Sequence, residues 1–197
     1  DGKAGNGKAL GLEKDSTFTL PFDTVGFPAS VSFDLYVEEE SAKDAALFES
    51  EDGAFHLNQK NKAGDYTGKF GFERDGYTYT FDYEVPMDQW IHMTITTDKD
   101  GTRLFVNGRP QGYAERTEFG KYVKKDLSSS MVLPTAAIGN GVVGKLDNLT
   151  IYNEVVEIPG TENIAPTAAS ADASNVFNDN FTGEKAIDGN LSTRWAT

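Results

Sequence analysis

The residues of this sequence that could do hydrolytic chemistry are its clustered carboxylates and its two histidines. A glycoside hydrolase needs two carboxyl groups held a few ångströms apart across the scissile bond. The candidate runs are residues 13–15 (Glu-Lys-Asp) and residues 49–52 (Glu-Ser-Glu-Asp), and neither offers that spacing. His56 and His92 have no Ser or Cys nucleophile signature near them in the sequence, and we interpret His92 as structural. The pattern therefore predicts no catalytic centre.

Two oxygen-rich stretches could hold calcium, which prefers oxygen ligands. Residues 98–101 (Asp-Lys-Asp-Gly) imitate the start of a calcium loop, but Arg109 stands where the closing acidic residue would be, so we interpret them as a turn. Asp188, Asn190 and Thr193 bring three oxygen donors into one tight loop, which suits Ca²⁺. An Asp-Gly-Asn turn without an ion fits these residues equally well.

Aromatic side chains offer another kind of chemistry, because their large apolar faces can stack on sugar rings. Four of them alternate with polar residues, which is typical of the buried face of a strand, so we expect Tyr77, Tyr79, Phe81 and Tyr83 to fill a core. Binding residues on rigid sandwiches usually lie on loops. The loop-borne candidates for carbohydrate binding are Tyr66, Arg74, Tyr113 and Tyr122.

Short strands and tight turns must position these residues. Residues 90–112 predict a meander, in which apolar side chains at positions 91, 93 and 95 share one face. Asn107 and Gly108 predict a two-residue hairpin turn, because both tolerate positive φ. We expect Trp90 to anchor the core and His92 to order its strand.

Similar runs recur along the chain without a helical period before residue 160. The predicted strands are residues 9–12, 17–20, 30–37, 45–49, 54–59, 69–72, 77–83, 136–139 and 145–152. Many short strands separated by Gly and Asx turns predict an all-β fold, a jelly-roll β-sandwich of two antiparallel sheets.

Composition limits the partners. The 197 residues carry 18 Lys and Arg against 31 Asp and Glu, a net charge of −13, which argues against nucleic acid and anionic membrane surfaces. There is no cysteine, and no apolar run approaches the ~20 residues of a membrane helix. Residues 1–3 (Asp-Gly-Lys) are typical of mid-sequence, so we expect the chain to be a piece of a longer protein.

Composition also predicts the domain boundaries. Residues 1–156 form the sandwich, and residues 157–162, which contain Pro159-Gly160, form a linker. Residues 163–197 are a polar segment too short to build a core of its own, and we expect a short irregular C-terminal tail there.

Three motifs in residues 1–155 resemble concanavalin A-like, laminin G-like modules of bacterial surface and secreted proteins. They are residues 7–10 (Gly-Lys-Ala-Leu), residues 90–92 (Trp-Ile-His) leading to residues 104–108 (Leu-Phe-Val-Asn-Gly), and residues 137–139 (Ala-Ile-Gly) followed by residues 144–153. Some glycanases with this fold carry Glu-x-Asp-x-x-Glu on one strand. Residues 13–15 lack the third carboxylate and residues 49–52 have the wrong spacing.

Two further resemblances concern the parent protein. Residues 71–83 are similar to accessory modules of family 20 glycoside hydrolases, the β-N-acetylhexosaminidases. Residues 186–195 (Ala-Ile-Asp-Gly-Asn-Leu-Ser-Thr-Arg-Trp) resemble the start of a discoidin, or coagulation factor 5/8 type C, domain. That family often holds a structural calcium, which implies a site of Asp188, Asn190 and Thr193 with the backbone carbonyl of Lys185.

These resemblances imply a non-catalytic accessory module of a secreted or cell-wall-attached bacterial glycoside hydrolase. Its partners would be glycans, containing N-acetylhexosamine or galactose, and other domains of the parent enzyme. An adhesin or structural module that binds a host protein or a neighbouring domain is the alternative. A hydrolase on this fold would instead need two carboxylates facing each other in a groove.

Overall fold

The structure, a computed structural model, describes residues 2–3, 7–116, 129–158, 178 and 182–186. The chain divides into two compact units, Asp1–Glu157 and Ile158–Thr197. The strands of the first unit are β1 (Leu10–Leu12), β2 (Thr24–Val25), β3 (Ala29–Val37), β4 (Ala46–Ser50), β5 (Gly53–His56), β6 (Gly71–Arg74), β7 (Tyr77–Phe81), β8 (Trp90–Asp98), β9 (Gly101–Val106), β10 (Arg109–Gln111), β11 (Tyr113–Arg116), β12 (Leu133–Pro134), β13 (Ala137–Asn140) and β14 (Gly144–Tyr152).

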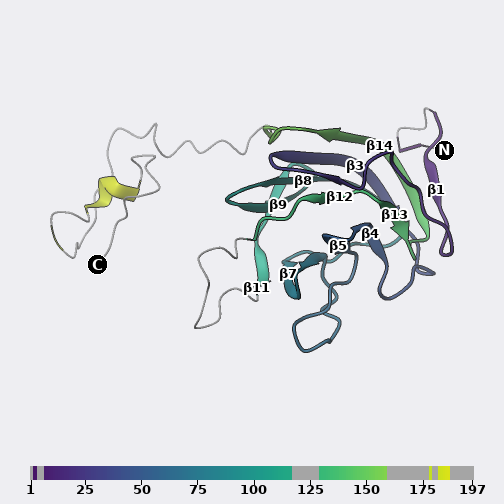
Figure 1. The fold of residues 1–197 in the computed structure, drawn as a ribbon, viewed down its shortest axis with the longest axis horizontal. Coiled ribbons are helices and arrows are strands. Elements are labelled where there is room, and N and C mark those ends of the chain that lie inside the picture. The colour runs from purple at the N-terminus through teal and green to yellow at the C-terminus, as the bar shows by residue number, and fades with distance from the viewer. Residues whose placement is uncertain (1, 4–6, 117–128, 159–177, 179–181, 187–197) are drawn as a thin grey trace. The chain divides into compact units, whose positions relative to one another are not determined.

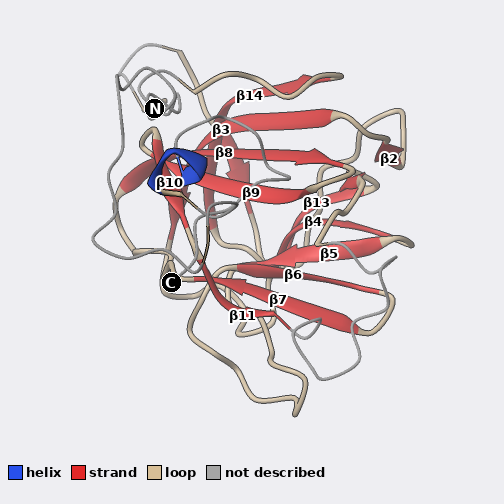
Figure 2. Ribbon diagram, turned by 90° about the vertical axis from the view of Figure 1, so that its left-hand side faces the viewer, coloured by secondary structure: helices blue, strands red, loops and turns tan. Residues whose placement is uncertain are grey.

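Two six-stranded antiparallel sheets form the layers of this unit (Figures 1 and 2). Sheet A has the strand order β1-β14-β3-β8-β9-β10, and sheet B has the order β11-β7-β6-β5-β4-β13. A short third sheet pairs β12 with β2. The predicted all-β jelly-roll sandwich is confirmed.

The core lies between the inner faces of the two sheets. On sheet A, Phe33 of β3 is paired in register with Met93 of β8, and both are fully buried. On sheet B, one cross-strand row is aromatic: Phe48, Phe55, Phe72 and Tyr79. Phe33 meets Phe48 edge to face across the core, with ring centroids 5.3 Å apart. Such pairs add about 0.5–1.5 kcal/mol beyond the area they bury.

The predicted aromatic alternation in β7 is a core feature, as expected. Tyr79 and Phe81 are fully buried, and Tyr77 and Tyr83 pack against the core. The hairpin turn between β9 and β10 is also confirmed, because Asn107 and Gly108 both have positive φ, 49° and 77°.

The expectation for Trp90 is wrong. Trp90 alternates with the buried Ile91, so its side chain points away from the core. It pairs in register with Tyr36 on the outer face of sheet A, with ring centroids 5.6 Å apart. The predicted strand at residues 17–20 is a single bridge between Phe18 and Ile138.

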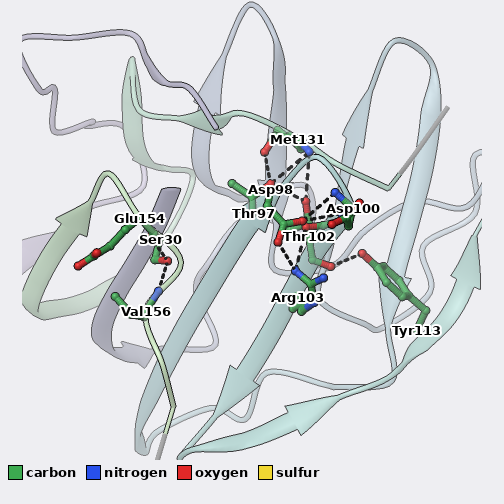
Figure 3. Close-up of polar contacts among 11 residues, drawn as sticks. Ser30, Thr97, Asp98, Asp100, Thr102, Arg103, Tyr113, Met131, Glu154 and Val156 are labelled. Carbon is green, nitrogen blue, oxygen red and sulfur yellow. Dashed lines mark hydrogen bonds and ion pairs between the residues drawn. The ribbon is translucent and has the colours of Figure 1, made fainter. Parts of the chain in front are cut away.

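Three short strands have no alternation long enough to be predicted: β2, β11 and β12. The segment leading to β12 is held by side chains of the β8–β9 hairpin (Figure 3). Thr97 Oγ1 donates to the Met131 carbonyl at 2.6 Å, and the Met131 N–H donates to Thr102 Oγ1 at 3.1 Å. Thr97 and Thr102 are register partners, so together they bind both the carbonyl and the N–H of Met131.

The described part of the second unit contains one element, the 3₁₀ helix η3 (Gly183–Ala186). Its Lys185 N–H donates to the Thr182 carbonyl at 3.0 Å. None of the helical segments in the described residues has the length and apolar content needed to cross a lipid bilayer.

Candidate functional site

A polar pocket of about 260 Å³ opens on the outer face of sheet B. Three of its residues, Glu49, His56 and Glu73, alternate with the buried aromatic row, so their side chains point away from the core. We call it the sheet B pocket. It is lined by Asp44, Ala46, Glu49, His56, Asn58, Gln59, Lys60, Tyr66, Glu73 and Asn140.

Strand register brings the carboxylates of this pocket together. Glu49 of β4 pairs with Ala54 of β5, and Ala54 pairs with Glu73 of β6. The two glutamates therefore stand in one cross-strand row with only a methyl group between them. Asn140 of β13 donates from Nδ2 to Glu49 Oε2 at 2.9 Å, which fixes one end of the row.

His56 lies beside Glu73 in the next row. Its Nδ1 is 3.3 Å from the Asp44 carbonyl oxygen, so Nδ1 carries the hydrogen and donates. Its Nε2 is 3.8 Å from Glu73 Oε1. The His56 imidazole lowers the pKa of the Glu73 carboxyl, burial opposes this, and Gln59 and Lys60 lower the pKa further. Glu73 thus stays ionised and can accept hydrogen bonds from a ligand.

The loop between β5 and β6 closes one side of the pocket. Gln59 is 1% exposed and anchors the loop, with its backbone bonded to Thr67 and Lys69. Its Nε2 donates to the Lys60 carbonyl at 2.9 Å, while its Oε1 has no hydrogen-bond partner among the described residues. The side chain packs over Gly71, where a Cβ would lie 2.8 Å from Gln59 Cβ. Gly71 is therefore required for the loop to dock.

Tyr66 presents its ring at the edge of the sheet B pocket. The Lys43 and Lys60 ammonium groups lie 4.5 Å and 4.8 Å from the ring centroid. Cation–π contacts of this kind are worth about 0.5–1 kcal/mol at exposed sites. The ring is thus held in place by two lysine side chains.

The structure places the predicted carbohydrate-binding residues in different surroundings. Tyr66 lines the sheet B pocket, and Arg74 lines a neighbouring hollow that shares Glu49 and Glu73 with it. Tyr113 stacks on the buried Phe81, with centroids 4.7 Å apart, and its hydroxyl donates to the Thr102 carbonyl (Figure 3). Tyr122 lies outside the described residues.

The predicted calcium ligands cannot be placed in the same way. Asp188, Asn190 and Thr193 lie outside the described residues, and only Lys185 lies within them. In the part of the chain that the structure describes, no cluster of three His, Asp or Glu side chains could hold a metal ion. The Asp98 carboxylate is used in its turn, where Oδ1 accepts from the N–H groups of Asp100 and Gly101 at 2.8 Å and 3.0 Å (Figure 3).

Sequence reasoning missed most of the sheet B pocket. Glu49, His56, Glu73 and Asn140 come from four different strands, and no local motif links them. The available signal was the alternation itself, which puts Glu49, His56 and Glu73 opposite the predicted core residues of their strands.

A second polar cluster lies on the outer face of sheet A. Asp34 of β3 pairs in register with His92 of β8, and Asp34 Oδ1 lies 2.9 Å from His92 Nδ1. On its other side, His92 Nε2 lies 3.1 Å from Ser32 Oγ. Lys3 and Asn148 also contact the Asp34 carboxylate, at 2.6 Å and 2.7 Å. His92 orders this face, but it does so together with a serine and an aspartate that the sequence did not connect to it.

The two six-stranded antiparallel sheets are consistent with a concanavalin A-like jelly-roll module. The family model described as "Concanavalin A-like lectin/glucanases superfamily" (Laminin_G_3) matches residues 12–157. The chain belongs to this family. None of the curated protein sequences compared with the chain matches it significantly.

The chain is similar to several solved structures at low sequence identity. Domain 4 of AbnA, a GH43 extracellular arabinanase from Geobacillus stearothermophilus in complex with arabinotriose, is 20% identical with a TM-score of 0.53, covering 80% of this chain and 75% of that one. The CBM40 of the Ruminococcus gnavus IT-sialidase, bound to α2,6 sialyllactose, is 13% identical with a TM-score of 0.45, covering 77% and 93%. A heptameric SAP-like pentraxin from Limulus polyphemus is 12% identical with a TM-score of 0.43, covering 76% of each chain.

Proposed function

We propose that the chain is a carbohydrate-binding module and that the sheet B pocket is its glycan site. The observation that carries this proposal is the composition of that pocket. Three carboxylates, an imidazole and three side-chain amides line it beside one tyrosine ring on the outer face of a rigid sheet. Few, well-placed polar groups with an aromatic wall are what fixes the orientation of a small ligand in a protein site.

The polar groups suit a neutral sugar. Glu49 and Glu73 accept hydrogen bonds from hydroxyl groups, and the amides of Asn58 and Asn140 can accept or donate. Three carboxylates line the pocket against one lysine, so a sugar acid would be repelled. The charge of the pocket favours neutral glycans, and the resemblance of residues 71–83 to accessory modules of β-N-acetylhexosaminidases adds the expectation that they contain N-acetylhexosamine or galactose. The arabinanase domain, which shares the fold and was solved with arabinotriose, supports glycan binding in general.

The wider role that we propose is that of an accessory module of a secreted or cell-wall-attached bacterial glycoside hydrolase of the β-N-acetylhexosaminidase type. The support is the resemblance of residues 71–83 to such modules and the resemblance of residues 186–195 to the start of a discoidin domain. In this role the module holds the enzyme on its substrate, and the structural calcium expected in the tail would serve the second domain.

A glycan array probed with the full chain tests the binding proposal, and titration calorimetry with the best glycan follows. His56→Ala and Glu73→Gln should each weaken binding by about tenfold or more, because each removes a group that faces the ligand. Glu51→Gln is the matched control, since Glu51 is an exposed acid of the neighbouring hollow and does not line the sheet B pocket. Failure of every glycan to bind at millimolar concentration would contradict the proposal.

The alternative, a module that docks on another protein, is favoured by one different observation. A largely apolar hollow lies beside β1 and β14, and it is lined by Leu10, Phe18, Leu20, Leu146, Asp147, Asn148 and Leu149. Leu10 and Phe18 are 39% and 40% exposed. Phe18→Ser should abolish docking to a neighbouring domain or host protein, which a pull-down with the parent enzyme would show. Glycan binding, measured by titration calorimetry, should stay unchanged.

A further inference from the structure

Ser32, His92 and Asp34 form a hydrogen-bonded relay on the outer face of sheet A, which we call the Ser32 relay. The two nitrogen atoms of the imidazole are used in different ways. Nδ1 lies 2.9 Å from Asp34 Oδ1, and Nε2 lies 3.1 Å from Ser32 Oγ. An ionised carboxylate can only accept, so Nδ1 carries the hydrogen and the neutral Nε2 is left to accept the hydroxyl proton. A nucleophile, a base and an orienting acid in this order are the arrangement that activates a serine.

The acid and the base of the relay are held in place. The Asp34 side chain is 7% exposed, and its Oδ2 accepts from Asn148 Nδ2 at 2.7 Å. The backbone of His92 is fixed by Asn107 of the β9–β10 turn, since the His92 N–H donates to Asn107 Oδ1 at 3.0 Å and the Asn107 N–H donates to the His92 carbonyl at 2.8 Å. The His92 side chain itself is 38% exposed, so a reactant from solvent can reach it.

We propose that Ser32 is an activated nucleophile that accepts an acyl group from a carboxylic ester. Ser32 Oγ forms a bond to the ester carbonyl carbon while its proton passes to His92 Nε2. The carbon–oxygen bond to the alcohol then breaks, and His92 returns the proton to the leaving oxygen. Water repeats the same steps on acyl-Ser32, giving the carboxylic acid and free Ser32.

The neighbouring residues define the class of ester. Tyr36 and Trp90 lie on the same face, each two residues along its strand from Asp34 and His92. Their ring centroids are 5.6 Å apart. Ser32 lies two residues from Asp34 on the opposite side, so with a rise of about 3.3 Å per residue the aromatic pair stands about 13 Å along the strands from Ser32. The pair offers a wall for a ring at that distance, so the ester that fits best has an extended alcohol portion that ends in a sugar or aryl ring.

The surroundings also predict that the reaction is slow. Ser32 lies in mid-strand between its ladder partners Thr94 and Thr150, where backbone N–H groups serve the sheet rather than an oxyanion. Loss of one oxyanion donor costs about 10²–10³ in rate in serine hydrolases. Lys3 also neutralises part of the Asp34 charge, with Nζ 2.6 Å from Oδ1. We therefore expect acyl transfer from activated esters and a long-lived acyl-Ser32.

The test is peptide mapping by mass spectrometry after incubation of the full chain with p-nitrophenyl acetate. The expected result is an acetyl group on Ser32 that is absent in Ser32→Ala and reduced about 100-fold in His92→Ala, since general-base catalysis contributes about 10²–10⁴. Added imidazole should restore acetylation of Ser32 in His92→Ala, which a merely structural histidine would not allow. Thr150→Ala, an exposed hydroxyl in the adjacent strand, should leave the rate unchanged.

If the unaltered chain carries acetyl groups on lysines but none on Ser32, the proposal is overturned, and no variant is needed to show it. Acetylation of Ser32 that is equally fast in a folded His92→Ala would overturn it as well. Because the Ser32 relay and the sheet B pocket lie on different sheets, glycan binding can fail or succeed independently of this result.

Discussion

Asp34 and His92 face each other as register partners of two central strands, and Asp34 Oδ1 lies 2.9 Å from His92 Nδ1. Burial raises the pKa of the Asp34 carboxyl, but the hydrogen bonds from Lys3, Asn148 and His92 outweigh it, so that the net pKa is below the ordinary value of 3.8. A carboxyl whose pKa is lower in the folded state stabilises the fold above the unfolded pKa. This stabilisation is lost as the pH falls below about 4.

Asp34→Asn should therefore lower the free energy of unfolding at pH 7 by about 2 kcal/mol, because three donors lose a charged acceptor. Urea unfolding at pH 7 and at pH 3 measures the effect, and the difference between the two chains should shrink at pH 3. Asp15→Asn, at an exposed position, is the control. An Asp34→Asn penalty that is the same at both pH values would show that the charge of Asp34 does not stabilise the fold.

Two adjacent threonines of β8 should respond oppositely to the same substitution. Thr97 Oγ1 donates to the Met131 carbonyl, whereas Thr96 Oγ1 is buried without a hydrogen-bond partner among the described residues. Thr97→Val leaves the Met131 carbonyl unpaired and should cost about 1–3 kcal/mol. Thr96→Val removes a buried hydroxyl that makes no bond, and should be neutral or stabilising. Thermal unfolding of the two variants side by side measures both effects, and a larger loss in Thr96→Val would refute the contact pattern.

The sequence predicts the core well and the polar sites poorly, and the reason is the range of the interactions. Phe33 and Met93 are predicted because alternation with period two is a property of each strand alone. The Asn107-Gly108 turn is predicted because positive φ is a demand on two adjacent residues. Glu49 and Glu73, in contrast, share a row only because β5 pairs with both of their strands. The register between strands cannot be predicted from the sequence of either strand alone.

The same limit explains why the sequence does not connect His92 with Ser32. His92 has no serine near it along the chain, yet Ser32 lies 3.1 Å away because β3 and β8 are neighbours in sheet A. Trp90 shows a different limit. Its aromatic type predicts that it is buried, whereas its place in the alternating pattern of β8 predicts that it faces solvent. The alternation is the better guide here, because Ile91 fills the core position.

Gly144 at the start of β14 should tolerate no side chain. Its φ is +153°, and a Cβ there would lie 2.0 Å from the Tyr36 carbonyl oxygen. Gly144→Ala should therefore cost about 3 kcal/mol or more, through backbone strain and displacement of β3. Gly112→Ala is the matched control, because a Cβ at Gly112 meets no atom within 4 Å. Chemical unfolding of the two variants measures the difference, and equal stability would contradict the close approach of β14 to β3.

The boundary predicted near residue 157 can be tested by shortening the chain. The first unit ends at Glu157, and Ser30 Oγ binds the backbone of Glu154 and Val156 just before it (Figure 3). A chain ending at Ile158 should keep the thermal unfolding midpoint of the full chain, whereas one ending at Asn153 loses both contacts and should unfold at a lower temperature. A large drop for the chain that ends at Ile158 would show that the second unit stabilises the sandwich.

Tyr66 and Tyr113 were predicted together as sugar-binding residues, and their surroundings now predict different behaviour. Tyr66 lines the sheet B pocket, with its ring held by two lysine ammonium groups. Tyr66→Ala should weaken glycan binding by about tenfold, because it removes the aromatic wall, and should leave stability within about 1 kcal/mol of the unaltered chain, because only exposed cation–π contacts are lost.

Tyr113→Phe should have the opposite profile. The hydroxyl of Tyr113 donates to the Thr102 carbonyl and its ring stacks on Phe81, so losing the hydroxyl should cost about 1 kcal/mol of stability and leave glycan affinity unchanged. Calorimetric titration with the best glycan and urea unfolding, applied to both variants, give the four numbers needed. If Tyr113→Phe weakens glycan binding while Tyr66→Ala does not, the site lies at the other edge of sheet B, beside β11.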